Sequence, residues 1–312
     1  MTPGPFTAEE RPGEALTRAD VFMKSMAYMG YSVMNIGVLD VALGVSHLQE
    51  LSKKHKIPMI SANLYTKATG ERVFPATLAV QAGPLKVGFF GLLSPRSPAI
   101  EKHIEPNGLE IRPVVQEAQA AVKELRAQGC DFIVLLSQLN RPEAEQVVNQ
   151  VSGIHLVLGS LTQDMTMKLA PIGPSYYADA FQKGKFLGEV MVHVRGNRDR
   201  YFMAGRRAAM EQERQDLASQ LMTTRSQLQI GDRGGIALTA DARKNLEQQL
   251  ADLKARQQKI TTELEGSLAL PPDASTLELS MVALDQTLPD DPTVDGWVKK
   301  FQKKYPKPKG GH

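Results

Sequence analysis

The stretch MGYSVMNIGVLDVALG, residues 29–44, decides how the rest of the chain is interpreted. It predicts the end of a helix, a strand over residues 32–36, and a tight turn after Gly37. In open α/β sheets, ligands bind beyond the carboxyl ends of the strands. The residues after Gly37, beginning with Val38 and Leu39, therefore lie where a functional site is expected.

Helix and strand patterns alternate around this stretch, which predicts βαβ units and a sheet covered by helices. Val21, Phe22, Met26 and Met29 should form the apolar face of the first helix. The expected helices cover residues 17–29, 45–56, 114–128, 142–151 and a closing segment after Pro292, and the expected strands cover residues 58–64, 76–81, 85–92, 132–137 and 154–158. Residues 165–194 have a shorter, strand-like period and are expected to form a second sheet, which residues 277–284 rejoin.

The composition changes at residue 205, where the chain becomes rich in Gln, Arg, Glu, Leu and Ala. Two series with alternating spacings of four and three predict an antiparallel helical hairpin with a coiled-coil seam. The series are Met210, Arg214, Leu217, Leu221, Thr224, Leu228 and Leu246, Leu250, Leu253, Gln257, Ile260, Leu264. A glycine-rich turn over residues 231–235 separates them, and Thr239 is the expected N-cap of the second helix.

Composition excludes several classes of protein. The 312 residues carry 37 basic and 34 acidic side chains, a net charge of +3, so we expect no nucleic-acid partner. No run of about 18 apolar residues exists, so no membrane span is expected. The first twenty residues lack the apolar core of a signal peptide.

Residues 29–44 resemble a signature of the bacterial 5'-nucleotidase branch of the metallophosphoesterases, in which a Gly-Tyr-Asp strand runs into Gly-Asn-His-Glu-Phe-Asp. In that family the Asn binds a metal ion and the His contacts the scissile phosphate. Aligned without a gap, this chain has Val38, Leu39 and Asp40 where the family has Asn, His and Glu. Residues 61–63 and 86–95 also resemble the family.

Two further family motifs have the same frame without the metal ligands. The family's Leu-Ser-His-Leu-Gly is Leu-Ser-Gln-Leu-Asn over residues 136–140, so Gln138 replaces a ligand His. The family's Gly-Gly-His-Thr-His is matched by residues 159–163, where Leu161 and Gln163 replace both His. The family's first two motifs, Asp-x-His and Gly-Asp, have no counterpart, so the first strands of the fold are expected to be missing from this sequence.

The resemblance implies that the polar residues near these motifs lie together at the position of the family's catalytic cleft. The candidate ligand-binding residues are Asp40, Asn63, Ser137, Gln138, Asn140, Ser160 and Thr162. They form a polar, nearly neutral set that suits a small hydrogen-bonding ligand or water. We expect no resident metal, because neutral amides bind a divalent cation poorly and leucine or valine not at all.

The six histidines and the single cysteine do not rebuild a site. No two histidines have the i,i+4 spacing of metal ligands. His55 is interpreted as a solvated helix residue and His155 as structural. Cys130 has no polarising neighbour in sequence and is interpreted as a packed thiol.

The expected fold is therefore α/β: a four-layer αββα metallophosphoesterase-like sandwich with an inserted antiparallel coiled-coil hairpin. The expected domains are residues 1–204 continued by 275–303, the hairpin 205–268, and a basic tail 304–312.

The sequence leaves three hypotheses about function. The first is a non-catalytic pseudoenzyme that binds a protein partner or a second copy through residues 205–268, or a small molecule in its cleft. The alternative is a metal-dependent hydrolase of 5'-nucleotidase type, with Mn or Zn in a remodelled or upstream-completed site. The third is an inactive fragment. The resemblance implies a periplasmic location, and a cytosolic one stays open.

Overall fold

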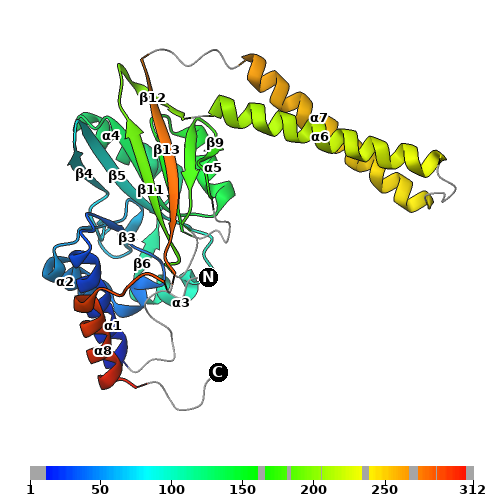
Figure 1. The fold of residues 1–312 in the computed structure, drawn as a ribbon. Coiled ribbons are helices and arrows are strands. Elements are labelled where there is room, and N and C mark those ends of the chain that lie inside the picture. Colours follow the sequence, from blue (N-terminus) through cyan, green and yellow to red (C-terminus); the bar gives the residue numbers. More distant parts are fainter. Residues whose placement is uncertain are drawn as a thin grey trace. The chain divides into compact units, whose positions relative to one another are not determined.

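The computed structural model describes residues 12–160, 166–180, 184–204, 206–233, 239–266, 273–285 and 287–306. The chain forms two compact units, Met1–Val194 with Glu278–His312, and Arg195–Leu277. Mixed helices and sheets confirm the expected α/β class (Figure 1).

The first unit is organised around a six-stranded sheet with the order β4-β5-β7-β8-β10-β9. Its strands are β4 (Thr77–Ala82), β5 (Leu85–Leu93), β7 (Phe132–Gln138), β8 (Leu156–Gly159), β9 (Ala170–Ile172) and β10 (Ser175–Ala178). Neighbours from β5 to β10 run parallel, whereas β4 and β9 are antiparallel to their partners. The carboxyl ends of β7 and β8 therefore lie side by side, and the motifs of the candidate site follow those ends.

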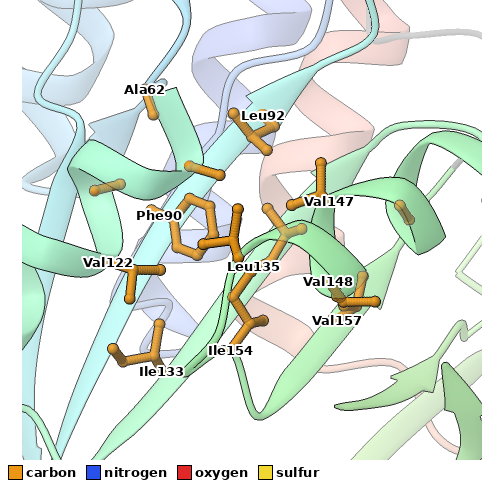
Figure 2. Packing of buried hydrophobic residues seen from close by; sticks show 14 of the residues in the cluster. Ala62, Phe90, Leu92, Val122, Ile133, Leu135, Val147, Val148, Ile154 and Val157 are labelled. Atoms are coloured by element: carbon orange, nitrogen blue, oxygen red, sulfur yellow. The ribbon is translucent and has the colours of Figure 1, made fainter. Parts of the chain in front are cut away.

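Two helices between the parallel strands supply the main hydrophobic core. Helix α4 (Val114–Ala127) packs on β4, β5 and α5 (Arg141–Gln150), at the positions predicted from the sequence. Its buried residues Ala118, Ala121, Val122 and Leu125 recur at helical spacing and face the sheet. Figure 2 shows Val122 of α4 beside Phe90 and Leu135 of the strands. Each such large side chain contributes about 1.5–3 kcal/mol by burial.

A second core lies under the opening stretch. Strand β1 (Met34–Asn35) pairs in parallel with β2 (Met59–Ile60), and α2 (Val45–His55) buries Leu48 and Leu51 as predicted. Helix α1 (Pro12–Tyr28) packs on α2. A short 3-10 helix, η1 (Asp40–Leu43), follows the turn at Gly37.

The predicted apolar face of α1 is wrong in part. Phe22 and Met29 are 46% and 61% exposed, whereas Met26 is buried as predicted. The side of the helix that is buried also carries Ala15, Ala19 and Met23.

The closing helix α8 (Pro292–Lys304) begins at Asp291, whose carboxylate accepts hydrogen bonds from the amides of Thr293 and Val294. It packs on α1, where Trp297 and Tyr28 meet edge to face with ring centroids 5.7 Å apart. Smaller elements complete this unit: β3 (Leu64–Thr66), α3 (Ile100–His103), η2 (Glu105–Asn107) and β6 (Leu109–Ile111).

The second sheet is smaller than expected. Strands β9 and β10 extend the six-stranded sheet, because β10 pairs in parallel with β8 and Ser175 donates to the carbonyl of Ile154. The remaining strands form a three-stranded sheet in which β13 (Ala274–Ala283) lies between β11 (Phe186–His193) and β12 (Asn197–Met203).

The second unit contains two long helices, α6 (Arg206–Arg233) and α7 (Ala240–Gly266), which run side by side in opposite directions (Figure 1). Their buried residues are Met210, Leu217, Leu221, Thr224, Ile260 and Leu264. All six belong to the predicted four-three series. Thr239 caps α7 by accepting a hydrogen bond from the amide of Ala242 (3.2 Å). That the pair is an insertion stays a prediction.

Candidate functional site

The turn after β1 is closed by its own aspartate. The amide of Gly37 donates to Oδ2 of Asp40 (2.7 Å), and the amide of Asp40 donates to the carbonyl of Gly37 (3.0 Å). Burial raises the pKa of the Asp40 carboxyl to about 6, while the Gly37 hydrogen bond favours its charged form and opposes that rise. The one carboxylate of the predicted site thus has a structural partner in its own turn.

Gln138, the last residue of β7, forms a hydrogen bond with this turn. Its Oε1 accepts a hydrogen bond from the amide of Val38 (2.8 Å). A Cβ atom at Gly37 would lie 2.5 Å from Nε2 of Gln138 and 3.0 Å from Oδ2 of Asp40. A methyl group at Gly37 would therefore press on the glutamine amide and the aspartate carboxylate, and these side-chain ends would have to shift. The structure brings together Gly37, Val38, Asp40 and Gln138.

Ser137 and Ser160 also meet at this edge. The hydroxyl of Ser160 donates to the carbonyl of Ser137 (3.0 Å). The hydroxyl of Ser137 accepts from the amide of Leu139 (3.2 Å) and is almost fully buried. These contacts hold the ends of β7 and β8 in register.

Asn63 and Asn140 have hydrogen-bond partners within the chain, and their place in a ligand set stays a prediction. Asn63 donates to the carbonyl of Leu93 (2.8 Å) and accepts from its amide (2.9 Å), as a strand neighbour does. Asn140 is the N-cap of α5 and accepts from the amide of Glu143 (2.9 Å). The carboxylate of Glu143 accepts from the amide of Asn140 in return (3.0 Å), which completes a capping box.

Leu161, Thr162 and Gln163 lie outside the described residues. Their predicted roles stay predictions.

Two polar residues that sequence reasoning missed support the site. Asn35 donates to the carbonyls of Leu136 (2.9 Å) and Leu92 (3.2 Å), so it joins β1 to both β7 and β5. Glu143 is 3% exposed, and it also accepts from the hydroxyl of Ser94 (2.9 Å). A polar residue inside an apolar strand, such as Asn35, is the sequence signal that could have pointed to the first contact.

Both histidines interpreted from sequence, His55 and His155, have hydrogen-bond partners within the chain. His55 is not solvated: its side chain is 8% exposed and its Nε2 lies 2.7 Å from Oδ1 of Asp20. His155 has the expected structural role, because Nδ1 accepts from the amide of Ile133 (2.9 Å) and the ring stacks on Phe132.

The described residues do not fit the metal ions that the family resemblance implies. Val38 and Leu39 offer no donor atom, and the Gln138 carbonyl is occupied by the Val38 amide. Asp40 is a single carboxylate directed at its own turn. Across the described ranges, no group of three or more His, Cys, Asp or Glu side chains is placed to hold an ion. Two-metal catalysis requires a cage of such groups.

The comparisons with known proteins agree with the fold. No family model matches the chain. The fold and the frame of the site, taken with the similarities below, define a 5'-nucleotidase-like metallophosphoesterase domain. This confirms the resemblance found in residues 29–44 and the later motifs.

Particular relatives are found by sequence and by structure. The chain is 30% identical over 129 residues to Protein UshA of Escherichia coli, covering 41% of this chain and 24% of that protein. It is 28% identical over 129 residues to a 5'-nucleotidase of Vibrio cholerae, covering 41% and 23%. The sulfate thiohydrolase SoxB of Thermus thermophilus aligns with a TM-score of 0.52 and 25% identity, covering 58% of this chain and 33% of that chain. The matched region is thus about a quarter of the length of these curated relatives.

Proposed function

We propose that this chain is a non-catalytic metallophosphoesterase-like domain that serves as a binding or scaffold component. The observation that carries the proposal is the hydrogen bond from the Val38 amide to Oε1 of Gln138. Both residues stand at positions where the family resemblance implies metal ligands. In this chain they hydrogen-bond to each other, and this contact joins the turn after β1 to the end of β7.

The electrostatics of the site support the same function. A phosphoester in transfer carries negative charge that metal ions or cationic side chains must neutralise. The described residues grouped at the site are Gly37, Val38, Asp40, Ser137, Gln138 and Ser160. None is cationic, and the one ionisable group, Asp40, adds negative charge when it deprotonates. This set favours a neutral, hydrogen-bonding ligand over a phosphate.

The helices α6 and α7 are the surface that we assign to a protein partner. Their seam is closed by buried residues such as Leu217 and Ile260 and by an ion pair between Arg256 and Glu213 (3.1 Å). The outward positions of both helices are exposed, including Met222 at 76%. A pair of long helices offers an extended surface for a partner helix.

Location belongs to the proposal as well. Among the described residues, no helix combines the length and the apolar character needed to cross a bilayer. A periplasmic location is the expectation from the family, and export of a tagged full-length protein into the periplasmic fraction is its test.

Phosphoesterase activity tests the proposal. We would assay the purified chain with bis(p-nitrophenyl) phosphate and with nucleoside monophosphates, in Mn²⁺ and separately in Zn²⁺. Because the described donors cannot cage two ions, we expect no rate above that of a heat-denatured sample. The matched variant is Asp40→Asn, which removes the one carboxylate of the site and keeps its shape.

The hydrolase hypothesis makes the opposite prediction. A metal-dependent rate that falls at least about tenfold in Asp40→Asn would show that Asp40 takes part in catalysis and would overturn the non-catalytic proposal. A rate that Asp40→Asn leaves unchanged would show that the Asp40 carboxylate does not take part in the reaction.

A further inference from the structure

The strand β11 and the second half of β13 form an antiparallel ribbon in the first unit. The amide of Leu284 donates to the carbonyl of Lys185 (2.7 Å), and the hydroxyl of Ser280 donates to the carboxylate of Glu189 (3.3 Å). These two contacts fix one register, in which Leu187 lies opposite Val282. Side chains opposite each other in such a pair lie on the same face of the ribbon.

One face of this ribbon carries four exposed apolar side chains. Leu187, Met191, Val282 and Leu284 are 55%, 48%, 46% and 43% exposed. All four fall on the face that carries Glu189, because alternate residues of a strand share a face. Scattered exposed leucines are normal in proteins, but four on one short ribbon form a patch, and such patches mark interaction sites.

The outer edge of β11 is also open. β11 is the terminal strand of its sheet, with β13 on its inner side. Since Lys185 bonds toward β13, the backbone groups of alternate residues from Lys185 point inward, and those of Phe186, Gly188, Val190 and Val192 point outward. No described segment of the chain pairs with this outer edge. Edge strands with open backbone groups and few charges readily pair with another strand.

We infer that β11 pairs in antiparallel fashion with β11 of a second copy of this chain, forming a two-fold symmetric dimer through a continuous sheet. The same edge and the same apolar stripe are present on both copies, as an isologous interface requires. Backbone hydrogen bonds supply the pairing, and contacts between facing side chains of the two β11 strands supply the buried area.

Side-chain contacts favour one register for this pairing over a neighbouring one. With Met191 opposite Met191 of the second copy, Glu189 lies opposite His193 of that copy, and the symmetry repeats the contact. Val190 then lies opposite Val192 of the second copy, so outward-pointing backbone groups meet each other. A shift that centres the pair on Glu189 sets two carboxylates face to face, which is unfavourable.

The size of the dimer tests the inference. We would measure the mass of the full chain by sedimentation equilibrium at concentrations from about 1 to 100 µM, a range that detects interfaces of micromolar affinity. The main variant is Val190→Pro. Its amide points outward, so proline removes an intermolecular hydrogen bond and leaves the pairing with β13 intact. We expect the dimer dissociation constant to rise at least about tenfold.

Charge reversal supplies a second test that does not depend on proline being tolerated. Glu189→Lys should weaken the dimer, because it places lysine opposite His193 of the second copy. Glu189→Lys combined with His193→Glu should restore it, since the lysine then lies opposite a glutamate of the second copy. Circular dichroism of each variant checks that the fold is kept.

The inference is overturned by three results. The first is a wild-type chain that stays monomeric at about 100 µM. The second is a dimer that neither Val190→Pro nor Glu189→Lys weakens, which would place the contact elsewhere, for example on α6 and α7. The third is a weakened Glu189→Lys dimer that the His193→Glu exchange does not restore.

Discussion

The backbone amide of Val38 lies 2.8 Å from Oε1 of Gln138 and donates a hydrogen bond to it, across 100 residues of chain. Val38 is itself buried, at 2% exposure. The contact joins the turn after β1 to the end of β7, the two places where the resemblance implies a shared metal site.

Removing the glutamine side chain should destabilise the fold. In Gln138→Ala the Val38 amide loses its acceptor at a buried position, and an unsatisfied buried amide costs about 1–3 kcal/mol. We expect the free energy of unfolding in urea to fall by that amount. Gln128→Ala, at an exposed position on the end of α4, is the control and should change stability by less than about 0.5 kcal/mol. Equal effects of the two substitutions would contradict the role of Gln138.

Gly37→Ala should strain the same contact. The new methyl group would lie 2.5 Å from Nε2 of Gln138, so the amide must move, at a cost of about 1–3 kcal/mol. The cost should shrink in the double variant with Gln138→Ala, because the obstructing side chain is gone. Gly296→Ala on α8 meets no atom within 4 Å and should be neutral or stabilising. Additive effects of Gly37→Ala and Gln138→Ala would show that the two do not touch.

Asp40 should make stability depend on pH. Its pKa is raised from 3.8 to about 6 by burial, so the folded chain binds a proton that the unfolded chain has released between those values. The protonated carboxyl therefore favours folding below about pH 4, and that advantage is lost as pH rises through about 6. Asp40→Asn stays neutral at every pH and keeps an acceptor for the Gly37 amide.

The measurement for Asp40 is urea unfolding of both proteins at two pH values. From about pH 4 to pH 7.5, the stability of Asp40→Asn relative to wild type should rise by an amount on the order of 1–3 kcal/mol. A constant difference between the two proteins across this range would show that the pKa of Asp40 is not raised in the folded state.

Asn140 should behave as a helix cap. Asn140→Ala removes the acceptor for the Glu143 amide and should cost about 0.5–2 kcal/mol, whereas Asn140→Ser keeps a capping oxygen and should cost much less. Thermal unfolding of the two variants checks this order. A ligand role would be indicated instead if both variants kept wild-type stability while a bound ligand was lost.

The sequence predicted most elements that bury a continuous apolar run. Helix α4 and strand β7 were found with bounds close to those observed, because Ala118, Leu125 and Ile133 fit a helical or strand period without competition. The alternating spacing of four and three likewise predicted the residues that are buried between α6 and α7. The α/β class and the family resemblance followed from these periods and from the quoted motifs.

What the sequence did not predict depends on tertiary contacts. Strands β9 and β10 have the period of any strand, and only the pairing of Tyr176 with Leu156 assigns them to the first sheet. The apolar pattern of α1 does not decide its buried face, because the neighbouring Phe22 and Met23 are both apolar and packing buries Met23 and leaves Phe22 exposed. The hydrogen bonds that Asn140 and Asn63 make within the chain are not visible in the sequence, because a free amide and a capping amide look alike there.

The metal content of the purified chain decides whether the site binds the ions of a two-metal phosphoesterase. We would express the full chain without a histidine tag in medium supplied with Mn²⁺ and Zn²⁺, and quantify both by elemental analysis after gel filtration. The described site offers no cage of charged donors. We therefore expect less than about a tenth of an ion per chain, and the same value for Asp40→Asn. One or two ions per chain, as two-metal phosphoesterases hold, with a loss in Asp40→Asn, would contradict it.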